Sequence, residues 1–323
     1  MRSYVDLVQH VLLHGQPRAD RTGTGTLSVF GAHWQHDLSA SFPLLTLKRM
    51  SFSSVLAELL WFIEGSTSAH RLRELGSTIW DEWADWRGEL GPIYGAQWRN
   101  WRTHDGQHVD QLAALLRSLA DNPMSRRHII SAWNVADLPD ETVGPHGNVA
   151  TGRMCLAPCH MTAQFYVAPL TLSARANLLC SQDREATYIL RRDAAQDVQH
   201  AVLDAAGVPV LGLSCHVYQR SADVFLGVPY NMASYAALTH MLAAQLGYGP
   251  DMLYFSYGDL HLYSDHNQPH IVGELLRRAG EPMLPPPQLR VQGKHAGIEG
   301  YTMADFQLLD YVSHPTIRAR VSV

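Results

Sequence analysis

The sequence predicts an α+β or α/β fold, built as one large domain from residue 1 to residue 323. Helix-like and strand-like patterns are interspersed along the chain, no stretch has the composition of a linker between two domains, and no internal repeat is present. Apolar residues make up 46% of the chain and charged residues 17%. A chain of this length and composition can therefore bury a large core.

Apolar residues at helical spacing predict helices at residues 4–14, 52–63, 69–75, 110–121, 232–246 and 268–278. Gly65 and Gly247 stand where two of these helices should end, because glycine tolerates the left-handed conformation of a helix C-terminus. Asn231 directly precedes one helix, so its structural interpretation is an N-cap.

Short β-rich runs predict strands at residues 26–34, 128–133, 161–167, 211–219 and 252–257. In the fourth run the apolar residues Leu213, Cys215 and Val217 alternate with polar or aromatic neighbours, as in a strand with one buried face.

Two segments are predicted to be insertions. Residues 138–151 are rich in Pro, Gly and Asp and have no clear period, whereas residues 168–210 begin in a turn-like stretch and continue into a surface helix at 184–206. We expect both to decorate an edge of the fold rather than to form a functional module.

The net charge of −5 and the absence of Lys/Arg runs argue against general affinity for nucleic acid or an anionic membrane. An anionic ligand would need a few placed arginines. Residues 1–15 have the pattern of an amphipathic helix rather than a signal peptide, and no stretch is apolar enough to span a bilayer. Four cysteines in so long a chain predict free thiols in a reducing compartment, hence a cytoplasmic protein.

Cys159, between Pro158 and His160, is a candidate nucleophile, because a histidine neighbour can lower the pKa of a thiol. A buried structural thiol is the alternative. A zinc site that includes Cys155 is disfavoured, because the spacing is not the paired C-x-x-C arrangement.

Arginines and hydroxyls recur where a phosphate could bind. Arg220 and Ser221 follow a strand, and Arg21 lies in a glycine-rich loop. Arg126 and Arg127 should point to opposite faces of a strand. Each motif taken singly also fits a solvated strand end or an ordinary turn.

Glu58 lies on an otherwise apolar helix, where a carboxylate tends to have a raised pKa and can transfer protons, although a charge at the rim of the core fits equally. Trp80 and Trp83 could stack on a flat cofactor or pack in the core. His261 and Tyr263 fall on one side of an extended segment and could bind a sugar hydroxyl.

The order of these motifs resembles thymidylate synthase. They are DRTGTGT at 20–26, ELLW at 58–61, IWDEW at 79–83, SRR at 125–127, APCHM at 157–161, QRSAD at 219–223, VPYN at 228–231 and GDLHLY at 258–263. The resemblance covers nearly the whole chain outside the two insertions. It implies a mixed, mainly antiparallel sheet covered by helices, in a two-fold symmetric homodimer.

The resemblance also implies reductive methylation of deoxyuridylate (dUMP) at C5 by 5,10-methylenetetrahydrofolate, without a metal. The catalytic positions that it assigns are Cys159, Glu58, Tyr94, His160 and Asp223. The positions for dUMP are Arg21, Gln219, Arg220, Ser221, Asp223, Asn231, His261 and Tyr263, with Arg126 and Arg127 reaching the phosphate of the other subunit. The positions for the folate are Ser51, Ile79, Trp80, Trp83, Asp223, Leu226, Gly227, Tyr230, Ser322 and Val323.

Asn231 distinguishes the pyrimidines, because a neutral amide can accept from uracil N3–H and donate to O4. Related hydroxymethylases that act on deoxycytidylate (dCMP) carry Asp at this place, so such an enzyme is the alternative. Ala222, Ser51 and Ser68 depart from the residues usual in the family. An inactive scaffold and an RNA-binding regulator are further alternatives, and we expect weak RNA binding at most.

Overall fold

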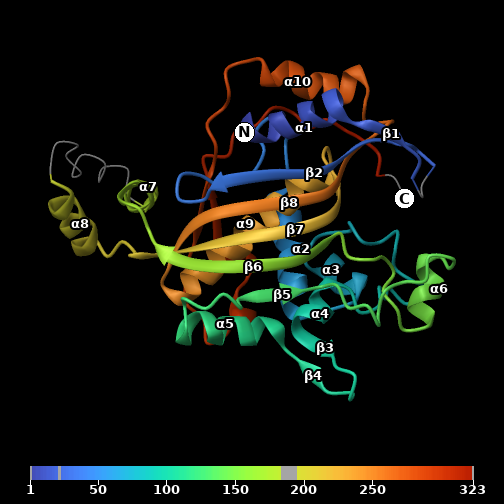
Figure 1. Ribbon diagram of the computed structural model, residues 1–323, viewed down its shortest axis with the longest axis horizontal. Helices are drawn as coiled ribbons and strands as arrows, with labels where there is room; N and C mark the ends of the chain where they lie inside the picture. The colour runs from blue at the N-terminus through green and yellow to red at the C-terminus, as the bar shows by residue number, and fades with distance from the viewer. Residues whose placement is uncertain (1, 21–22, 183–194, 322–323) are drawn as a thin grey trace.

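The computed structural model of the chain describes residues 2–20, 23–182 and 195–321. A six-stranded sheet lies at its centre (Figure 1). In spatial order its strands are β1 (Gln16–Arg18), β2 (Thr26–Asp37), β8 (Gly249–Tyr263), β7 (Leu211–Asp223), β6 (His160–Pro169) and β5 (Ile129–Ser131). Only β7 and β8 run parallel. The mixed, mainly antiparallel sheet implied by the resemblance is confirmed.

The remaining elements cover this sheet or extend from it. The helices are α1 (Arg2–His14), α2 (Phe52–Glu64), α3 (Ala69–Glu74), α4 (Tyr94–Asn100), α5 (Gln111–Asp121), α6 (Pro145–Ala150), α7 (Leu172–Gln182), α8 (Gln196–Ala205), α9 (Gly227–Leu246) and α10 (Glu274–Ala279), with a π-helical turn η2 (Pro269–Gly273) and 3-10 turns η3 (Ile298–Gly300) and η4 (Met303–Asp305). Two small hairpins pair β3 (Trp101–Arg102) with β4 (His108–Val109), and β9 (Gln288–Val291) with β10 (Phe306–Leu309).

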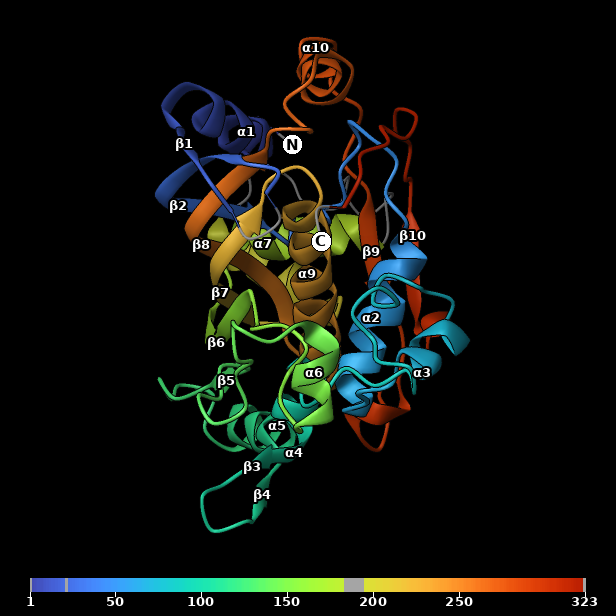
Figure 2. The same ribbon diagram turned by 90° about the vertical axis from the view of Figure 1, so that its right-hand side faces the viewer.

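The core lies between one face of the sheet and the long helix α9, with α2 beside it (Figure 2). Every residue from Met232 to Ala243 is buried, as expected for a helix that packs on all sides. On β7 the predicted alternation holds: Leu213, Cys215 and Val217 are buried, and His216 and Tyr218 are exposed. Ser214 is also buried, because its hydroxyl donates to Asp251 Oδ2 at 2.9 Å.

Helix α9 begins at Gly227, five residues before the predicted start, so the N-cap interpretation of Asn231 is wrong. Pro229 does not prevent this, because a proline in the first turn removes no hydrogen bond within the helix. Gly65 and Gly247 end α2 and α9 in the left-handed conformation, with φ of 72° and 76°, as predicted. The predicted helix at 268–278 is divided into η2 and α10.

The segment 168–210 sits at the tip of the β6–β7 hairpin, where Pro169 pairs with Leu211. It begins with the helix α7 rather than with a turn, and the described part of the predicted surface helix is α8. The segment has a small core of its own, and a buried Arg175 that pairs with Asp204. Figure 1 shows α7 and α8 at the opposite side of the sheet from α6.

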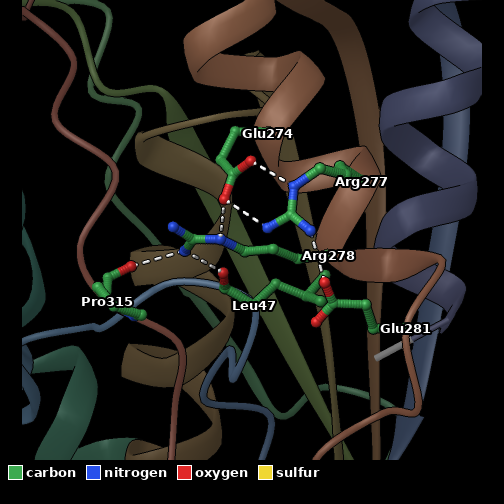
Figure 3. Close-up of polar contacts among 6 residues, drawn as sticks. All are labelled: Leu47, Glu274, Arg277, Arg278, Glu281 and Pro315. Carbon is green, nitrogen blue, oxygen red and sulfur yellow. Dashed lines mark hydrogen bonds and ion pairs between the residues drawn. The ribbon is translucent and has the colours of Figure 1, made fainter.

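A buried arginine on α10 holds the C-terminal segment against the loop that precedes α2 (Figure 3). Arg278 Nη1 donates to the carbonyl oxygens of Leu47 at 2.9 Å and Pro315 at 2.6 Å, and its Nε donates to Glu274 at 2.7 Å. These hydrogen bonds fix the position of Pro315 relative to α10 and to the loop before α2.

Helices α2 and α4 approach each other closely at Gly95. A Cβ placed on Gly95 would lie 2.6 Å from the carbonyl oxygen and 2.8 Å from the Cα of Phe62, and neither backbone atom can rotate away. This contact sets the spacing between the helix that carries Glu58 and the helix that begins with Tyr94.

We predict that Gly95→Ala lowers the free energy of unfolding by about 1–3 kcal/mol, because α2 and α4 must move apart. Urea denaturation measures this loss. The matched control is Gly144→Ala, where an added Cβ meets nothing within 4 Å at a φ of −66° and the change should stay within about 0.5 kcal/mol. Equal stability of the two variants would contradict the close contact.

Candidate active site

A cavity of about 790 Å³ opens beside the ends of β7 and β8. It brings together residues from distant parts of the chain, and the predicted site residues among them are Trp83, Cys159, Arg220, Ser221, His261 and Tyr263. The sheet register explains part of this grouping, because Ser221 pairs with Asp259, and Asp223 pairs with His261.

Cys159 is fixed by its backbone on two sides. Its amide donates to Tyr94 Oη at 2.8 Å, and its carbonyl oxygen accepts from the Arg220 amide at 2.8 Å. The Arg220 guanidinium also donates to the carbonyl oxygens of Pro158 at 2.9 Å and Ala157 at 2.8 Å. The loop that carries the thiol therefore keeps one position relative to β7 and α4.

The Cys159 thiol has a raised pKa, not the lowered one that its histidine neighbour suggested. Burial raises the pKa, and this outweighs the lowering that the Arg220 charge and a hydrogen bond with Tyr94 produce. The thiol must consequently lose its proton as it reacts, and Arg220 is the charge that favours the thiolate.

His160 is held away from this chemistry as a neutral ring. It stacks on Tyr94 with the ring centroids 4.1 Å apart, and its Nδ1 lies 2.9 Å from Tyr235 Oη. Burial lowers the pKa of His160 to about 3. His160, the first residue of β6, is buried and supports the Tyr94 ring from the core side, while Cys159 in the preceding loop lines the cavity.

Glu58 has the raised pKa that its apolar helix predicted. Burial raises the pKa to about 7, although a hydrogen bond of 2.8 Å from Trp80 Nε1 to Glu58 Oε1 acts to lower it. The Trp80 ring packs edge-on against Tyr94 at 5.9 Å and against Trp83 at 5.6 Å. Trp80 thus links the carboxylate to the tyrosine that contacts Cys159.

The orientation of Asn231 is fixed by Gln219. Gln219 Nε2 donates to the Ser221 carbonyl oxygen at 3.1 Å and to Asn231 Oδ1 at 3.0 Å. A carbonyl oxygen can only accept, so the Gln219 amide group must point its nitrogen there, and Asn231 must turn its oxygen toward Gln219. Gly227 leaves this amide open on one side, since a Cβ there would lie 3.8 Å from Asn231 Oδ1.

Asp223 is an ionised carboxylate. Burial alone would raise its pKa, but His266, the Phe225 amide and His261 together outweigh burial and lower the pKa. The Phe225 amide donates to Asp223 Oδ1 at 2.9 Å, and His266 Nδ1 lies 3.7 Å from the same oxygen.

The rings of His261 and Tyr263 meet edge-on with centroids 5.1 Å apart. His261 Nδ1 lies 3.1 Å from Asp259 Oδ1, so the carboxylate fixes this nitrogen as the donor. Nε2 is then the ring atom that can contact a hydroxyl.

Several predicted site residues lie elsewhere. Arg126 and Arg127 are both exposed in the turn before β5 instead of opening the strand, and within the described part of the chain neither guanidinium forms a hydrogen bond or ion pair. Ser51 is the N-cap of α2, accepting from the Ser54 amide at 3.3 Å, and Ile79 is exposed. Leu226 and Tyr230 flank the start of α9. Arg21, Ser322 and Val323 fall outside the described residues.

Residues 139–145 and Asn148 also line the cavity, although they belong to the predicted insertion 138–151. The prediction that this segment only decorates an edge of the fold is therefore wrong. Its position was the signal available from the sequence, because only residues 152–158 separate it from Cys159.

No helix in the ranges 2–20, 23–182 and 195–321 is long and apolar enough to cross a membrane. The same residues contain no group of three or more His, Cys, Asp or Glu side chains placed to hold a metal ion.

A cavity at the end of a sheet that gathers a cysteine, an arginine and a His–Tyr pair is typical of an enzyme that acts on a small molecule. The family model of thymidylate synthase matches residues 2–323. The chain belongs to the thymidylate synthase family and is therefore a methyltransferase.

We predict that Trp80→Phe raises the pKa of Glu58 above 7, because the hydrogen bond that favours the carboxylate is lost while burial remains. A hydrogen bond worth about 1 kcal/mol corresponds to a rise of somewhat under one pH unit. A ¹³C-NMR titration of labelled glutamate measures it. The control is Trp61→Phe, which removes an indole that donates to Ser68 O instead, and an equal rise there would contradict the assignment.

Proposed function

We propose that the protein methylates dUMP at C5, using 5,10-methylenetetrahydrofolate and a covalent bond between Cys159 and C6 of the uracil. The products are dTMP and dihydrofolate. The observation that carries this proposal is the single cavity that holds the Cys159 thiol together with Arg220, Ser221 and the His261–Tyr263 pair.

The nucleotide would lie along this cavity from phosphate to base. Arg220 and Ser221 suit the phosphate. Two N–H groups of Arg220 donate to backbone carbonyl oxygens, and its remaining N–H groups can donate to a ligand. Arg21 is the further phosphate ligand that the family resemblance implies. The His261 Nε2 and Tyr263 suit the sugar 3′-hydroxyl.

The base would be recognised by the Asn231 amide. Because Gln219 already donates to Asn231 Oδ1, the Asn231 oxygen keeps one acceptor position and its Nδ2 keeps its donors. This pattern matches uracil, which donates from N3–H and accepts at O4. It supports dUMP over dCMP, and so supports methylation over the hydroxymethylase alternative.

The chemistry begins with the thiol. The sulfur of Cys159 forms a bond to C6, its proton passes to a base, and the electron pair of the C5–C6 double bond moves toward C5 and O4. C5 would then bond to the one-carbon unit, and its proton would leave as the bond from that carbon to the folate nitrogen breaks. A hydride from the folate would complete the methyl group while the C6–S bond breaks and releases the thiolate. Tyr94, which contacts the Cys159 amide, and Glu58, with a pKa of about 7, are the groups that we propose would move these protons.

The folate would supply the one-carbon unit and a hydride. The rings of Trp80 and Trp83 suit a flat pterin, and the ionised Asp223 suits its N–H donors. Gly227 and Leu226 lie next to Asp223 at the start of α9, with Tyr230 one turn further on. Ser51, Ile79, Ser322 and Val323 are carried over from the family resemblance alone.

We also propose a homodimer formed through the outer face of the sheet. Ile129, Gln164, His216, Tyr254 and Gln35 stand in register across five strands and are all exposed. Tyr166 and Tyr218 add exposed aromatic area to the same face, which is typical of a protein interface. Arg126 and Arg127 lie just before β5, at the border of this face.

The four cysteines and the net charge support a cytoplasmic enzyme with no more than weak affinity for RNA. Cys155, Cys159 and Cys215 are thiols outside any disulfide.

We predict that the protein produces dihydrofolate, followed by its near-UV absorbance, when mixed with methylenetetrahydrofolate and dUMP but not with dCMP. Cys159→Ser should lower the rate by several orders of magnitude while nucleotide binding persists. Asn231→Asp should shift the preference toward dCMP by at least about tenfold, because the carboxylate no longer donates to O4. Exchange of the C5 proton without dihydrofolate would instead favour a hydroxymethylase.

We predict that a purified heterodimer of Arg126→Glu and Cys159→Ser subunits has about half the activity of the wild-type dimer, because one site then holds both intact residues. Each homodimer should be nearly inactive. The control pairs Cys159→Ser with Arg220→Glu, two changes within one subunit's own site, and should restore nothing. Equal recovery in both pairings, or none in the first, would contradict shared sites.

A further inference from the structure

His266 is a buried histidine that packs against a residue proposed to bind dUMP. It stands in the turn after β8, three residues beyond Tyr263, and its backbone amide donates to the Tyr263 carbonyl oxygen at 3.0 Å. Its ring meets the Tyr263 ring edge-on with centroids 5.6 Å apart, and lies tilted against the Phe225 ring at 5.5 Å. His266 is 0% exposed, so the surrounding protein fixes the position of the ring.

Each ring nitrogen of His266 faces an acceptor. Nε2 lies 2.7 Å from the carbonyl oxygen of Arg320, in the C-terminal segment. Nδ1 lies 3.7 Å from Oδ1 of the ionised Asp223, which is proposed to bind the folate. A carbonyl oxygen and a carboxylate only accept, and a neutral imidazole carries a single N–H. The neutral ring can therefore donate on one side only, whereas the imidazolium offers a donor on both.

The groups around the ring favour the imidazolium. Burial acts to lower the pKa of His266, but Asp223, the Arg320 carbonyl oxygen and Asp265 together outweigh burial and raise the pKa. Asp265 belongs to the same turn, and its Oδ1 lies 3.8 Å from Nε2 of the ring. The ring thus lies among negative charges and acceptors that stabilise its charged form.

Three further titratable groups act on the same Asp223 carboxylate. Burial lowers the pKa of Lys48 to about 8, although the charge of Asp223 acts to raise it. His261 helps to lower the pKa of Asp223. Burial and the charge of Asp223 raise the pKa of the Tyr4 hydroxyl, which stays neutral. Within the described part of the chain, His266 is the member of this group whose hydrogen bond reaches the C-terminal segment.

The charge of His266 therefore connects two parts of the proposed folate site. Asp223 is one of them, and the other begins just after Arg320, because Ser322 and Val323 follow it in the chain. When the ring loses its proton, one of its nitrogens becomes an acceptor that faces another acceptor. Either the hydrogen bond to Arg320 or the attraction to Asp223 is then lost. Since the pKa of His266 is raised, both contacts are present below this pKa, and one is lost as the pH rises through it.

We propose that His266, as an imidazolium, is a positioning residue for the folate, which holds the Asp223 carboxylate and the C-terminal segment in one arrangement. The neutral ring no longer holds both, so the affinity for the folate falls as the pH rises. The proposal rests on the proposed function for the identity of the cofactor.

The test uses two variants, His266→Gln and His266→Asn, which both replace the ring by a neutral amide. At about pH 6.5, His266→Gln should raise the KM for methylenetetrahydrofolate at least about fivefold, because Asp223 loses a cationic partner. The KM for dUMP and the kcat should change less. The ratio of the variant's KM for the folate to that of the wild type should fall toward one as the pH rises, because the wild-type ring then becomes neutral as well.

A second readout does not involve the folate. The Gln side chain is long enough to donate to the Arg320 carbonyl oxygen, whereas the Asn side chain is too short. Carboxypeptidase should therefore remove the residues after Arg320 several-fold faster from His266→Asn than from His266→Gln at the same pH. In the wild type, ¹⁵N-NMR of labelled histidine at about pH 6.5 should show one slowly exchanging ring that is protonated on both nitrogens.

The matched control is His295→Gln. His295 Nε2 also lies near a carboxylate, at 3.2 Å from Asp305 Oδ1, but neither residue lines the cavity. This variant should change neither the KM values nor the trimming rate. A ratio of KM values that does not vary with pH, equal trimming of the two His266 variants, or no doubly protonated ring in the wild type overturns this inference alone. Failure of the wild type to form dihydrofolate from dUMP overturns the proposed function instead, and the trimming and NMR results still decide the contact between His266 and Arg320.

Discussion

The hydrogen bonds from the Arg220 guanidinium to the carbonyl oxygens of Ala157 and Pro158 are the contact on which the site depends. They tie the loop before β6 to the strand β7, and the Arg220 amide adds a third bond to the Cys159 carbonyl oxygen. The positive charge of the same guanidinium lowers the pKa of the Cys159 thiol, whereas burial raises it. One side chain thus positions the nucleophile, favours its thiolate and lines the cavity. A lysine at this position would lack the planar, forked set of N–H donors with which Arg220 reaches both carbonyl oxygens.

Burial separates the protonation states of groups that lie near one another. It raises the pKa of Glu58 to about 7 and lowers that of His160 to about 3, while Asp223 stays ionised because its partners outweigh burial. A carboxyl group that titrates near neutral pH can both accept and donate a proton, whereas a neutral imidazole packed on Tyr94 can only hold the ring in place. Asp223 has charged partners in the core and stays ionised, whereas burial decides the pKa of Glu58 and of His160.

The sequence was sufficient for features that depend on local pattern. The alternation around Cys215 and the glycine ends of α2 and α9 were predictable, and the raised pKa of Glu58 followed from its apolar helix. The mixed sheet was implied by the family resemblance instead. Features that depend on tertiary partners were not. His160 pairs with Tyr235, which is 75 residues away, and Asn231 lies inside a helix that begins at Gly227 without a side-chain cap. A turn-like composition likewise hid α7, which is stabilised by a small core shared with α8.

The two insertions differ in consequence because they lie at opposite ends of β6: the segment 138–151 comes before this strand and the segment 168–210 follows it. Cys159 precedes His160, which pairs with Gln219 at one end of β6, whereas the segment 168–210 joins the strands at the other end, where Pro169 pairs with Leu211. The 10 residues of β6 span roughly 30 Å, so the distant insertion can be built around its own core without touching the cavity. The segment 138–151 has no such separation, since residues 152–158 lead directly to the thiol. Its internal hydrogen bonds through Asn148 keep it in one shape where it lines the cavity.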